Sequence, residues 1–352
     1  MSFGDKQVSE RIGRLFTDEQ IAGRFNGSAL VAREGQVLWE GGCGYADYVH
    51  AIPNDATTVF KIGSMTKAFV SLAVLQTAER GLLKTSDTID SYLPGFPQGD
   101  RVTIYQLMTH TSGVWCYLQS ANSPLQHSMS VPHTPEWLVE CIWGRPFDFV
   151  PGTRWKYSNS GYVLLGLIIE KVTGLPLGEL ISKWILRPLH LTSTVFDPSE
   201  NSLLDRLAVG YLDVANQTPI VAPNLHASVT YSSGAMLSTV QDMYKWDRAI
   251  RGRQLVSPES WEILLTPGMG NYACGWWVDE IDIGGLARRN EWHWGVCYGF
   301  HGMITRLVDD DIVIIILQNV ISPDLEVPEY PKALFRLRDR VLAELFDSPI
   351  QT

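Results

Sequence analysis

A serine and a lysine stand three residues apart at the start of a segment with a helical pattern. The spacing is Ser64-x-x-Lys67, and the pattern that contains it continues over residues 66–80 and stops at Gly81. Positions three apart share one face of a helix, so Lys67 can place its amine beside the Ser64 hydroxyl. A serine hydroxyl becomes a nucleophile when a nearby base removes its proton, and a desolvated lysine can serve as that base. The predicted chemistry is attack on a carbonyl, with the amides of the helix start stabilising the oxyanion.

A tyrosine and an asparagine form a second candidate pair, Tyr157-x-Asn159, directly before a helical segment at residues 160–173. A junction of this kind presents a phenol and an amide together. A nearby lysine ammonium would favour the phenolate of Tyr157, which could then shuttle protons at neutral pH. Short motifs also arise by chance, so each of these pairs is equally consistent with an ordinary helix start.

The third candidate is the run His293-Trp294-Gly295-Val296 on a predicted strand. Gly295 would let a substrate backbone or acyl group approach closely, because it carries no side chain. The backbone amide of Val296 could then supply a second oxyanion donor, beside that of Ser64. His293 by itself is more typical of a structural histidine than of a catalytic one.

In this order and at these separations, the three motifs resemble those of the serine β-lactamase and DD-peptidase (penicillin-binding protein) superfamily. The resemblance is closest to the branch of class C β-lactamases, D-Ala-D-Ala carboxypeptidases, D-aminopeptidases and related esterases. It runs from about residue 26 to residue 319 and includes the further similar stretches 107–113, 157–174 and 234–239. It implies a sheet flanked by helices plus a helical domain, with the active site in the cleft between them.

The resemblance also implies roles for the motif residues. Ser64 would be the acylated nucleophile, and Lys67 and Tyr157 the pair that transfers protons. Which of the two is the base stays open, because coupled groups titrate as a unit. Asn159 would bind the amide or carbonyl of the substrate, and His293 would stand where many relatives have lysine.

The third motif departs from the superfamily at its middle position. Penicillin-recognising relatives usually have Thr or Ser there, and the hydroxyl helps to bind a substrate carboxylate, whereas this chain has Trp294, which is expected to line the substrate site. An indole offers one N–H donor and much more bulk. Histidine in place of lysine also lowers the positive charge at neutral pH. We therefore expect inefficient β-lactam turnover, unless Arg288 or Arg289 compensates.

The elements that position these motifs come from both ends of the chain. An amphipathic helix is predicted over the first twenty residues, a hairpin at 28–32 and 36–40, and helices at 66–80, 160–173 and 239–250, each stopping at a glycine that favours the left-handed conformation. Strand patterns return at 272–278, 293–306 and 311–318, before a last helix at 332–346. The predicted fold is α+β, an antiparallel sheet built from both chain ends and flanked by helices, with a large, mainly helical insertion. Residues 1–60 and 270–352 would form the sheet domain, and residues 61–269 the helical domain.

Two further features have mainly structural interpretations. His110, in the stretch 107–113, is expected to stabilise a turn. The aromatic residues of the loop at 113–135 either line an acyl pocket or pack the loop, and the sequence favours neither. They include Trp115, Tyr117, His127 and His133.

Composition narrows the class of protein. The 352 residues are 45% hydrophobic and carry a net charge of −10, and no cationic cluster is present, so nucleic acid is excluded as a partner. No apolar run approaches the roughly 20 residues of a membrane helix. Five cysteines without C-x-x-C spacing are read as reduced thiols. Since the N-terminus has no apolar signal region, the sequence predicts a cytoplasmic protein, or an exported one whose signal has been removed.

The leading prediction is a serine hydrolase that forms an acyl-enzyme on an ester or amide, of the esterase or D-amino-acid amidase type. A D-Ala-D-Ala carboxypeptidase or weak class C-like β-lactamase is the alternative within the class. A penicillin- or peptidoglycan-binding domain without turnover is the alternative outside it. The partner is a small ester, amide or peptide, and no metal or organic cofactor is expected, because the sequence has neither a metal-ligand motif nor a phosphate loop. The oligomeric state is left open.

Overall fold

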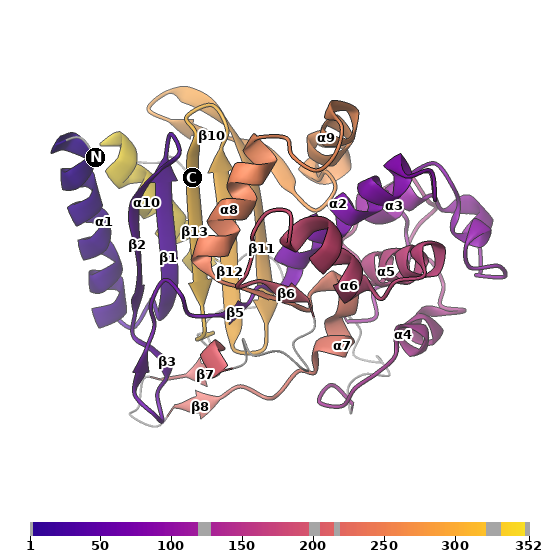
Figure 1. Cartoon of the computed structure of the whole chain (residues 1–352), viewed down its shortest axis with the longest axis horizontal. Helices are drawn as coiled ribbons and strands as arrows, with labels where there is room; N and C mark the ends of the chain where they lie inside the picture. Colours follow the sequence, from indigo (N-terminus) through magenta and orange to yellow (C-terminus); the bar gives the residue numbers. More distant parts are fainter. Residues whose placement is uncertain (1–2, 119–127, 197–204, 215–218, 322–331, 349–352) are drawn as a thin grey trace.

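The computed structural model describes residues 3–118, 128–196, 205–214, 219–321 and 332–348. Its main feature is a six-stranded antiparallel sheet in the order β10-β11-β12-β13-β1-β2 (Figure 1). The strands are β1 (Gly27–Arg33), β2 (Gln36–Cys43), β10 (Trp277–Ile283), β11 (Leu286–Cys297), β12 (Phe300–Leu307) and β13 (Ile312–Gln318). The first strand pairs with the last, from Gly27 opposite Gln318 to Arg33 opposite Ile312. The predicted sheet built from both chain ends is thus confirmed.

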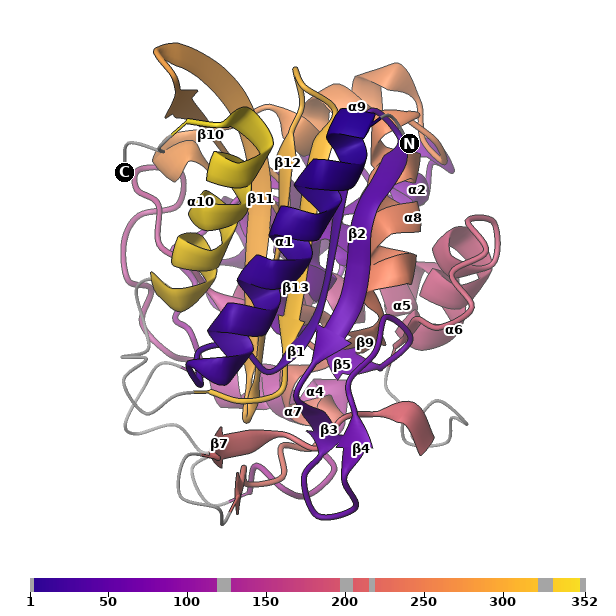
Figure 2. The same ribbon diagram turned by 90° about the vertical axis from the view of Figure 1, so that its left-hand side faces the viewer.

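Two terminal helices cover one face of this sheet. Figure 2 shows α1 (Phe3–Ile21) and α10 (Lys332–Phe346) side by side in front of the strands. Together with the sheet they bury one apolar cluster, which includes Ile12, Phe16 and Val341. Since every second residue of a strand points to the same face, the other residues of these strands face the rest of the protein.

The helical part of the chain lies on the opposite face (Figure 1). Its central helix is α2, which is almost wholly buried and packs against α5, α6 and α9. The helices are α2 (Thr66–Glu79), α3 (Ile104–Met108), α4 (Pro135–Ile142), α5 (Asn159–Thr173), α6 (Leu177–Ile181), α7 (Ala227–Thr230), α8 (Val240–Arg251) and α9 (Pro258–Leu265). Short strands form a three-stranded sheet, β5 (Phe60–Lys61), β9 (Met236–Ser238) and β6 (Val195–Phe196), and two ribbons, β3 (Tyr45–Asp47) with β4 (Ile52–Pro53) and β7 (Tyr211–Asp213) with β8 (Ile220–Val221).

The two parts share one apolar core. Helix α8 falls within the predicted helical domain, yet it packs on β13 and β1 of the large sheet. Its Trp246 stacks on Phe69 of α2, with ring centroids 4.1 Å apart. The same cluster continues to Leu30 of β1. The division of the chain at residues 61 and 269 therefore stays a prediction.

Three local predictions are corrected by backbone conformation. The strand expected from residue 272 begins at Trp277, because Gly275 adopts φ +85° and turns the chain before it. The strand region 293–306 is two strands, β11 and β12, joined by a turn with Gly299 at φ +76°. Gly252 after α8 is not left-handed, since its φ is −75°, and Arg253 takes a positive φ of +47° instead.

Three expectations from the sequence concern membrane helices, cysteine thiols and metal sites. No helix among the described residues is long and apolar enough to cross a membrane. All five cysteines are free thiols, and four of them are buried. Within the same ranges, no group of three or more His, Cys, Asp or Glu side chains is arranged to hold a metal ion.

Replacing Gly295 by alanine should destabilise the protein. A Cβ atom there would overlap the carbonyl oxygen of Ile62 and crowd the amide of Ser64, both of which are backbone atoms. Overpacking of this kind costs about 1–3 kcal/mol, and we expect the upper end. Thermal and urea unfolding of Gly295→Ala would measure the loss. Gly268→Ala is the control, because a Cβ atom at that position would make only ordinary van der Waals contact. Equal stability of the two variants would contradict the packing described.

Candidate active site

Ser64 and Lys67 lie where the chain enters α2. Ser64 is the middle residue of a 3₁₀ turn, Gly63–Met65, and Lys67 is the second residue of the helix. The Lys67 side chain is fully buried, and its Nζ donates a hydrogen bond to Ser64 Oγ at 3.1 Å. The i, i+3 spacing read from the sequence thus brings the two groups into contact.

The environment of Lys67 disfavours its charge. Its Nζ also donates to Asn159 Oδ1 at 2.8 Å and to the carbonyl of Ser233 at 2.7 Å. None of the three acceptors is a carboxylate. Burial therefore lowers the pKa of Lys67 well below its ordinary value. A neutral amine keeps two N–H groups, which can serve Asn159 and Ser233, and its lone pair can then accept a hydrogen bond from the Ser64 hydroxyl.

Tyr157 turns the face of its ring toward the lysine, with Lys67 Nζ 4.8 Å from the ring centroid. Its hydroxyl is buried and has no hydrogen-bond partner among the described residues. Burial raises the pKa of this phenol, and the nearby Ser64 hydroxyl offsets only part of the increase. The structure therefore does not support the expected phenolate, because burial disfavours the charged forms of both Tyr157 and Lys67. Tyr157 is a protonated phenol at neutral pH.

Asn159 is the first residue of α5, and its side chain is oriented from two sides. Its Oδ1 accepts the hydrogen bond from Lys67, while its backbone N–H donates to Cys116 Sγ at 3.3 Å. The Nδ2 group lies 3.7 Å from the same sulfur. The thiol takes the place of a capping side chain, because the Ser158 hydroxyl donates to the Val114 carbonyl instead.

Strand β11 lies against the 3₁₀ turn and carries the third motif. Gly295 packs against the backbone amide of Ser64, and Gly63 packs against that of Val296. The two predicted oxyanion donors therefore lie where β11 meets the 3₁₀ turn. His293 is fully buried; its Nδ1–H donates to the Trp294 carbonyl at 2.7 Å, and its Nε2 accepts from the Tyr272 hydroxyl at 3.2 Å. Burial lowers the pKa of His293 to about 3, so the ring is neutral.

Trp294 lies apart from this group. Neighbouring strand residues point to opposite faces, and Trp294 packs against the apolar cluster beneath α1 and α10. Its ring is parallel to that of Trp277, with centroids 6.4 Å apart. Arg288 pairs with Asp310, and Arg289 with Glu291. The two arginines considered as anchors for a substrate carboxylate thus already have acidic partners.

Several residues of the site were missed in the sequence. They are Cys116, the backbone of Ser233, Tyr272 and Trp277, whose ring is parallel to that of Tyr157 at 5.9 Å. The aromatic-rich run at residues 272–277 was the one signal that could have pointed to the last two. His110, expected in a turn, has a left-handed backbone and also packs against Tyr157.

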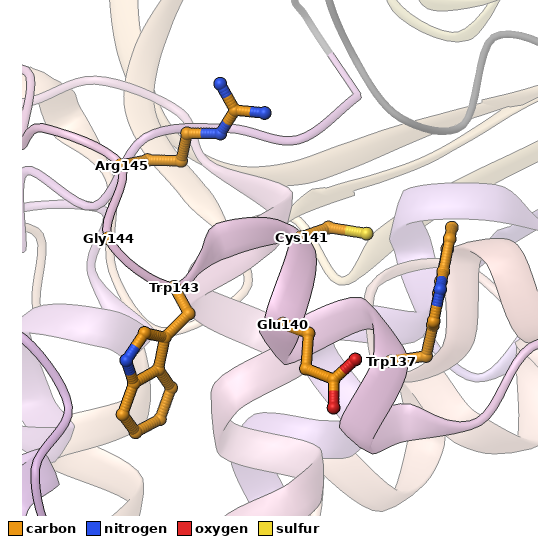
Figure 3. Close-up of a pocket in the computed structure, with 6 residues that line it drawn as sticks. All are labelled: Trp137, Glu140, Cys141, Trp143, Gly144 and Arg145. Carbon is orange, nitrogen blue, oxygen red and sulfur yellow. The ribbon is translucent and has the colours of Figure 1, made fainter.

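In the described part of the loop at 113–135, three of the aromatic residues pack against neighbouring parts of the protein. Tyr117 is fully buried, the Arg145 guanidinium lies 5.0 Å from the Trp115 ring centroid, and His133 stacks on Trp137 at 3.9 Å. His127 is outside the described residues. Figure 3 shows a surface pocket on and after α4, lined by Trp137, Glu140, Cys141, Trp143, Gly144 and Arg145. None of these residues belongs to the group around Ser64.

Comparison with known proteins identifies the family. A family model described as Beta-lactamase matches residues 13–334. The chain belongs to the beta-lactamase family. The predicted superfamily is confirmed, and the protein is a serine hydrolase of the β-lactamase and penicillin-binding-protein superfamily.

Members of this family with related sequences include two proteins of Bacillus subtilis (strain 168). The putative penicillin-binding protein PbpX is 33% identical over 280 residues, which are 78% of this chain and 68% of the relative. Penicillin-binding protein 4* is 30% identical over 348 residues, 93% of this chain and 74% of the relative.

Solved structures with the same fold are more distant in sequence. A D-amino acid amidase from Ochrobactrum anthropi SV3 superposes with a TM-score of 0.83 at 22% identity, over 97% of this chain and 99% of the other. A penicillin-binding protein from Bacillus halodurans gives 0.78 at 23% identity, over 94% and 98%. The predicted α+β fold of this family is confirmed.

Proposed function

We propose that the protein hydrolyses an ester or amide that carries no carboxylate, through an acyl-enzyme on Ser64. The observation that carries the proposal is the Ser64 Oγ to Lys67 Nζ contact of 3.1 Å, with a lysine whose three acceptors in the described structure include no carboxylate. A neutral amine at this distance can remove the hydroxyl proton as the oxygen attacks the carbonyl carbon. The amides of Ser64 and Val296 would then stabilise the oxyanion.

Lys67 is the base in this proposal and Tyr157 the proton donor. The pKa of Lys67 lies well below its ordinary value, which supports an amine without its proton. The pKa of Tyr157 is raised, which supports a phenol that stays protonated until it donates its proton to the leaving group. In the second step the Tyr157 phenolate takes a proton from the water that attacks the acyl-enzyme, and the Lys67 ammonium returns its proton to Ser64 Oγ as the acid product leaves.

The charges around the site favour a substrate without a carboxylate. Burial keeps His293 uncharged, and Arg288 and Arg289 are paired with acidic residues at the far end of β11. None of these three residues therefore offers a cation that could anchor a substrate carboxylate. One neighbour of the same fold is a D-amino acid amidase that was crystallised with L-phenylalanine amide. An amide or short ester is the substrate class that agrees with both observations.

Steady-state hydrolysis of a substrate panel tests this function. The panel contains p-nitrophenyl butyrate, D-phenylalanine amide, a D-Ala-D-Ala peptide and nitrocefin, with Ser64→Ala as the control for background hydrolysis. We expect kcat/KM to be about 10- to 100-fold higher for the better of the two substrates without a carboxylate than for either carboxylate-bearing one. A missing hydrogen bond to a charged group is worth about that factor.

Two results would contradict the proposal. Preference for the peptide or for nitrocefin would indicate a carboxypeptidase or a β-lactamase. Stable acylation of Ser64 without turnover of any substrate would indicate a penicillin- or peptidoglycan-binding domain.

A further inference from the structure

His110 holds the chain on both sides of Tyr157. Its carbonyl accepts a hydrogen bond from the backbone N–H of Lys156 at 3.0 Å. Its Nδ1 accepts another from the backbone N–H of Ser158 at 3.2 Å. The imidazole also packs on the Tyr157 ring, with centroids 4.2 Å apart. One residue therefore contacts the residue before Tyr157, the residue after it and the ring itself.

The backbone of His110 is strained. Its φ is +58°, in the left-handed region that residues with a Cβ seldom adopt, and the residue is 1% exposed. Such a conformation costs of order 1–3 kcal/mol and persists where the surrounding structure enforces it, often at functional sites. Other described residues with a Cβ, such as Arg253, also have a positive φ, so what distinguishes His110 is the combination of this backbone with its contacts around Tyr157.

The protonation of His110 is fixed by its surroundings. Since Nδ1 accepts a hydrogen bond, the neutral ring carries its proton on Nε2, which has no hydrogen-bond partner among the described residues. Burial, and then the nearby Lys67 and His293, lower the pKa of His110 well below its ordinary value. The ring thus stays an acceptor for the Ser158 N–H over the working range of pH.

We propose that His110 is a positioning residue for Tyr157. The Tyr157 hydroxyl has no hydrogen bond of its own among the described residues, so its direction depends on the backbone at Lys156 and Ser158 and on the packing of its ring. His110 supplies both backbone contacts, and it packs against the ring, as Trp277 also does. The inference rests on the proposed role of Tyr157 in proton transfer.

A double-mutant cycle tests whether His110 acts through Tyr157. His110→Gly relieves the backbone and removes both the ring and Nδ1. We expect it to lower kcat by about 10- to 100-fold in the wild-type background, with KM changed by less than about threefold. In the Tyr157→Phe background the same change should lower kcat by less than about threefold. Equal factors in the two backgrounds would overturn the proposal.

The single variant Tyr157→Phe separates this inference from the proposed function. Full activity of Tyr157→Phe would remove the proton-donor role of Tyr157 and the positioning role of His110 with it, while hydrolysis through Ser64 would stand. Impaired Tyr157→Phe with a multiplying loss from His110→Gly would remove the positioning role alone.

A pair of amide variants keeps the test decisive if the glycine variant fails to fold. Asparagine tolerates the left-handed backbone, and its short amide can accept from the Ser158 N–H. Glutamine carries the same amide one methylene farther out. We expect His110→Asn to retain at least about tenfold more activity than His110→Gln, with the fold of each checked by circular dichroism. Equal activity of the two would show that the Nδ1 contact does not position Tyr157.

Discussion

Ser64→Ala should abolish covalent labelling and nearly all turnover. The variant keeps the 3₁₀ turn and the buried lysine but removes the hydroxyl that Lys67 contacts at 3.1 Å. Loss of an activated nucleophile lowers turnover by about 10⁴-fold or more, and the remainder comes from binding and oxyanion donors. Intact-protein mass spectrometry after reaction with a serine-directed phosphonate should show one adduct on the wild type and none on the variant.

Ser233→Ala is the matched control for that experiment. Ser233 contributes its carbonyl to Lys67, and its hydroxyl donates to the Thr230 carbonyl, so the substitution removes a serine near the site but not the contact with the lysine. We expect it to be labelled like the wild type. An adduct on Ser64→Ala would place the nucleophile on another residue.

Changes at Lys67 and Tyr157 should each lower kcat by about 10²- to 10⁴-fold, and together by little more than either alone. The two groups would act on one proton path, so breaking it at either point removes the same advantage. Lys67→Ala, Tyr157→Phe and the double variant would be compared by steady-state kinetics. Losses that multiply would mean that the residues act independently.

The same assignment predicts the direction of the pH profile. The rate needs Lys67 without its proton, so kcat/KM should rise with pH through the pKa of Lys67 and then level off. Burial lowers that pKa, so the plateau should begin well below pH 10.5. In Lys67→Arg the guanidinium stays charged, so high pH should not restore activity. A profile that rises only near the ordinary pKa of lysine would contradict a desolvated base.

Local spacing made part of the site predictable. Ser64 and Lys67 are joined by the geometry of one helix start, so their contact follows from the sequence alone. The carbonyl of Ser233 stands 166 positions from Lys67, and Cys116 stands 43 positions from Asn159. A backbone carbonyl carries no residue-specific signal, and a lone cysteine has no spacing to recognise. These partners depend on how distant segments pack.

Burial explains the expectations that failed at the site. The lowered pKa of Lys67 agrees with the expected desolvated lysine, whereas the residue type of Tyr157 does not show how much solvent packing removes from the phenol, which sets the direction of its pKa shift. The position of Trp294 depends in the same way on which face of β11 meets α1 and α10. The strand itself was predictable from its composition, whereas the face was not.

The pairing of β1 with β13 has a consequence for protein synthesis. On the ribosome, residues 27–33 emerge long before residues 312–318, with which they pair inside the sheet. Contacts so far apart in sequence slow folding, because the intervening chain must be ordered before they form. The apolar core that surrounds α2 includes residues from both strands, so it cannot close on a nascent chain that lacks β13. Hydrolytic activity should therefore appear only after translation has passed the last strand, and products of premature termination before it should be inactive.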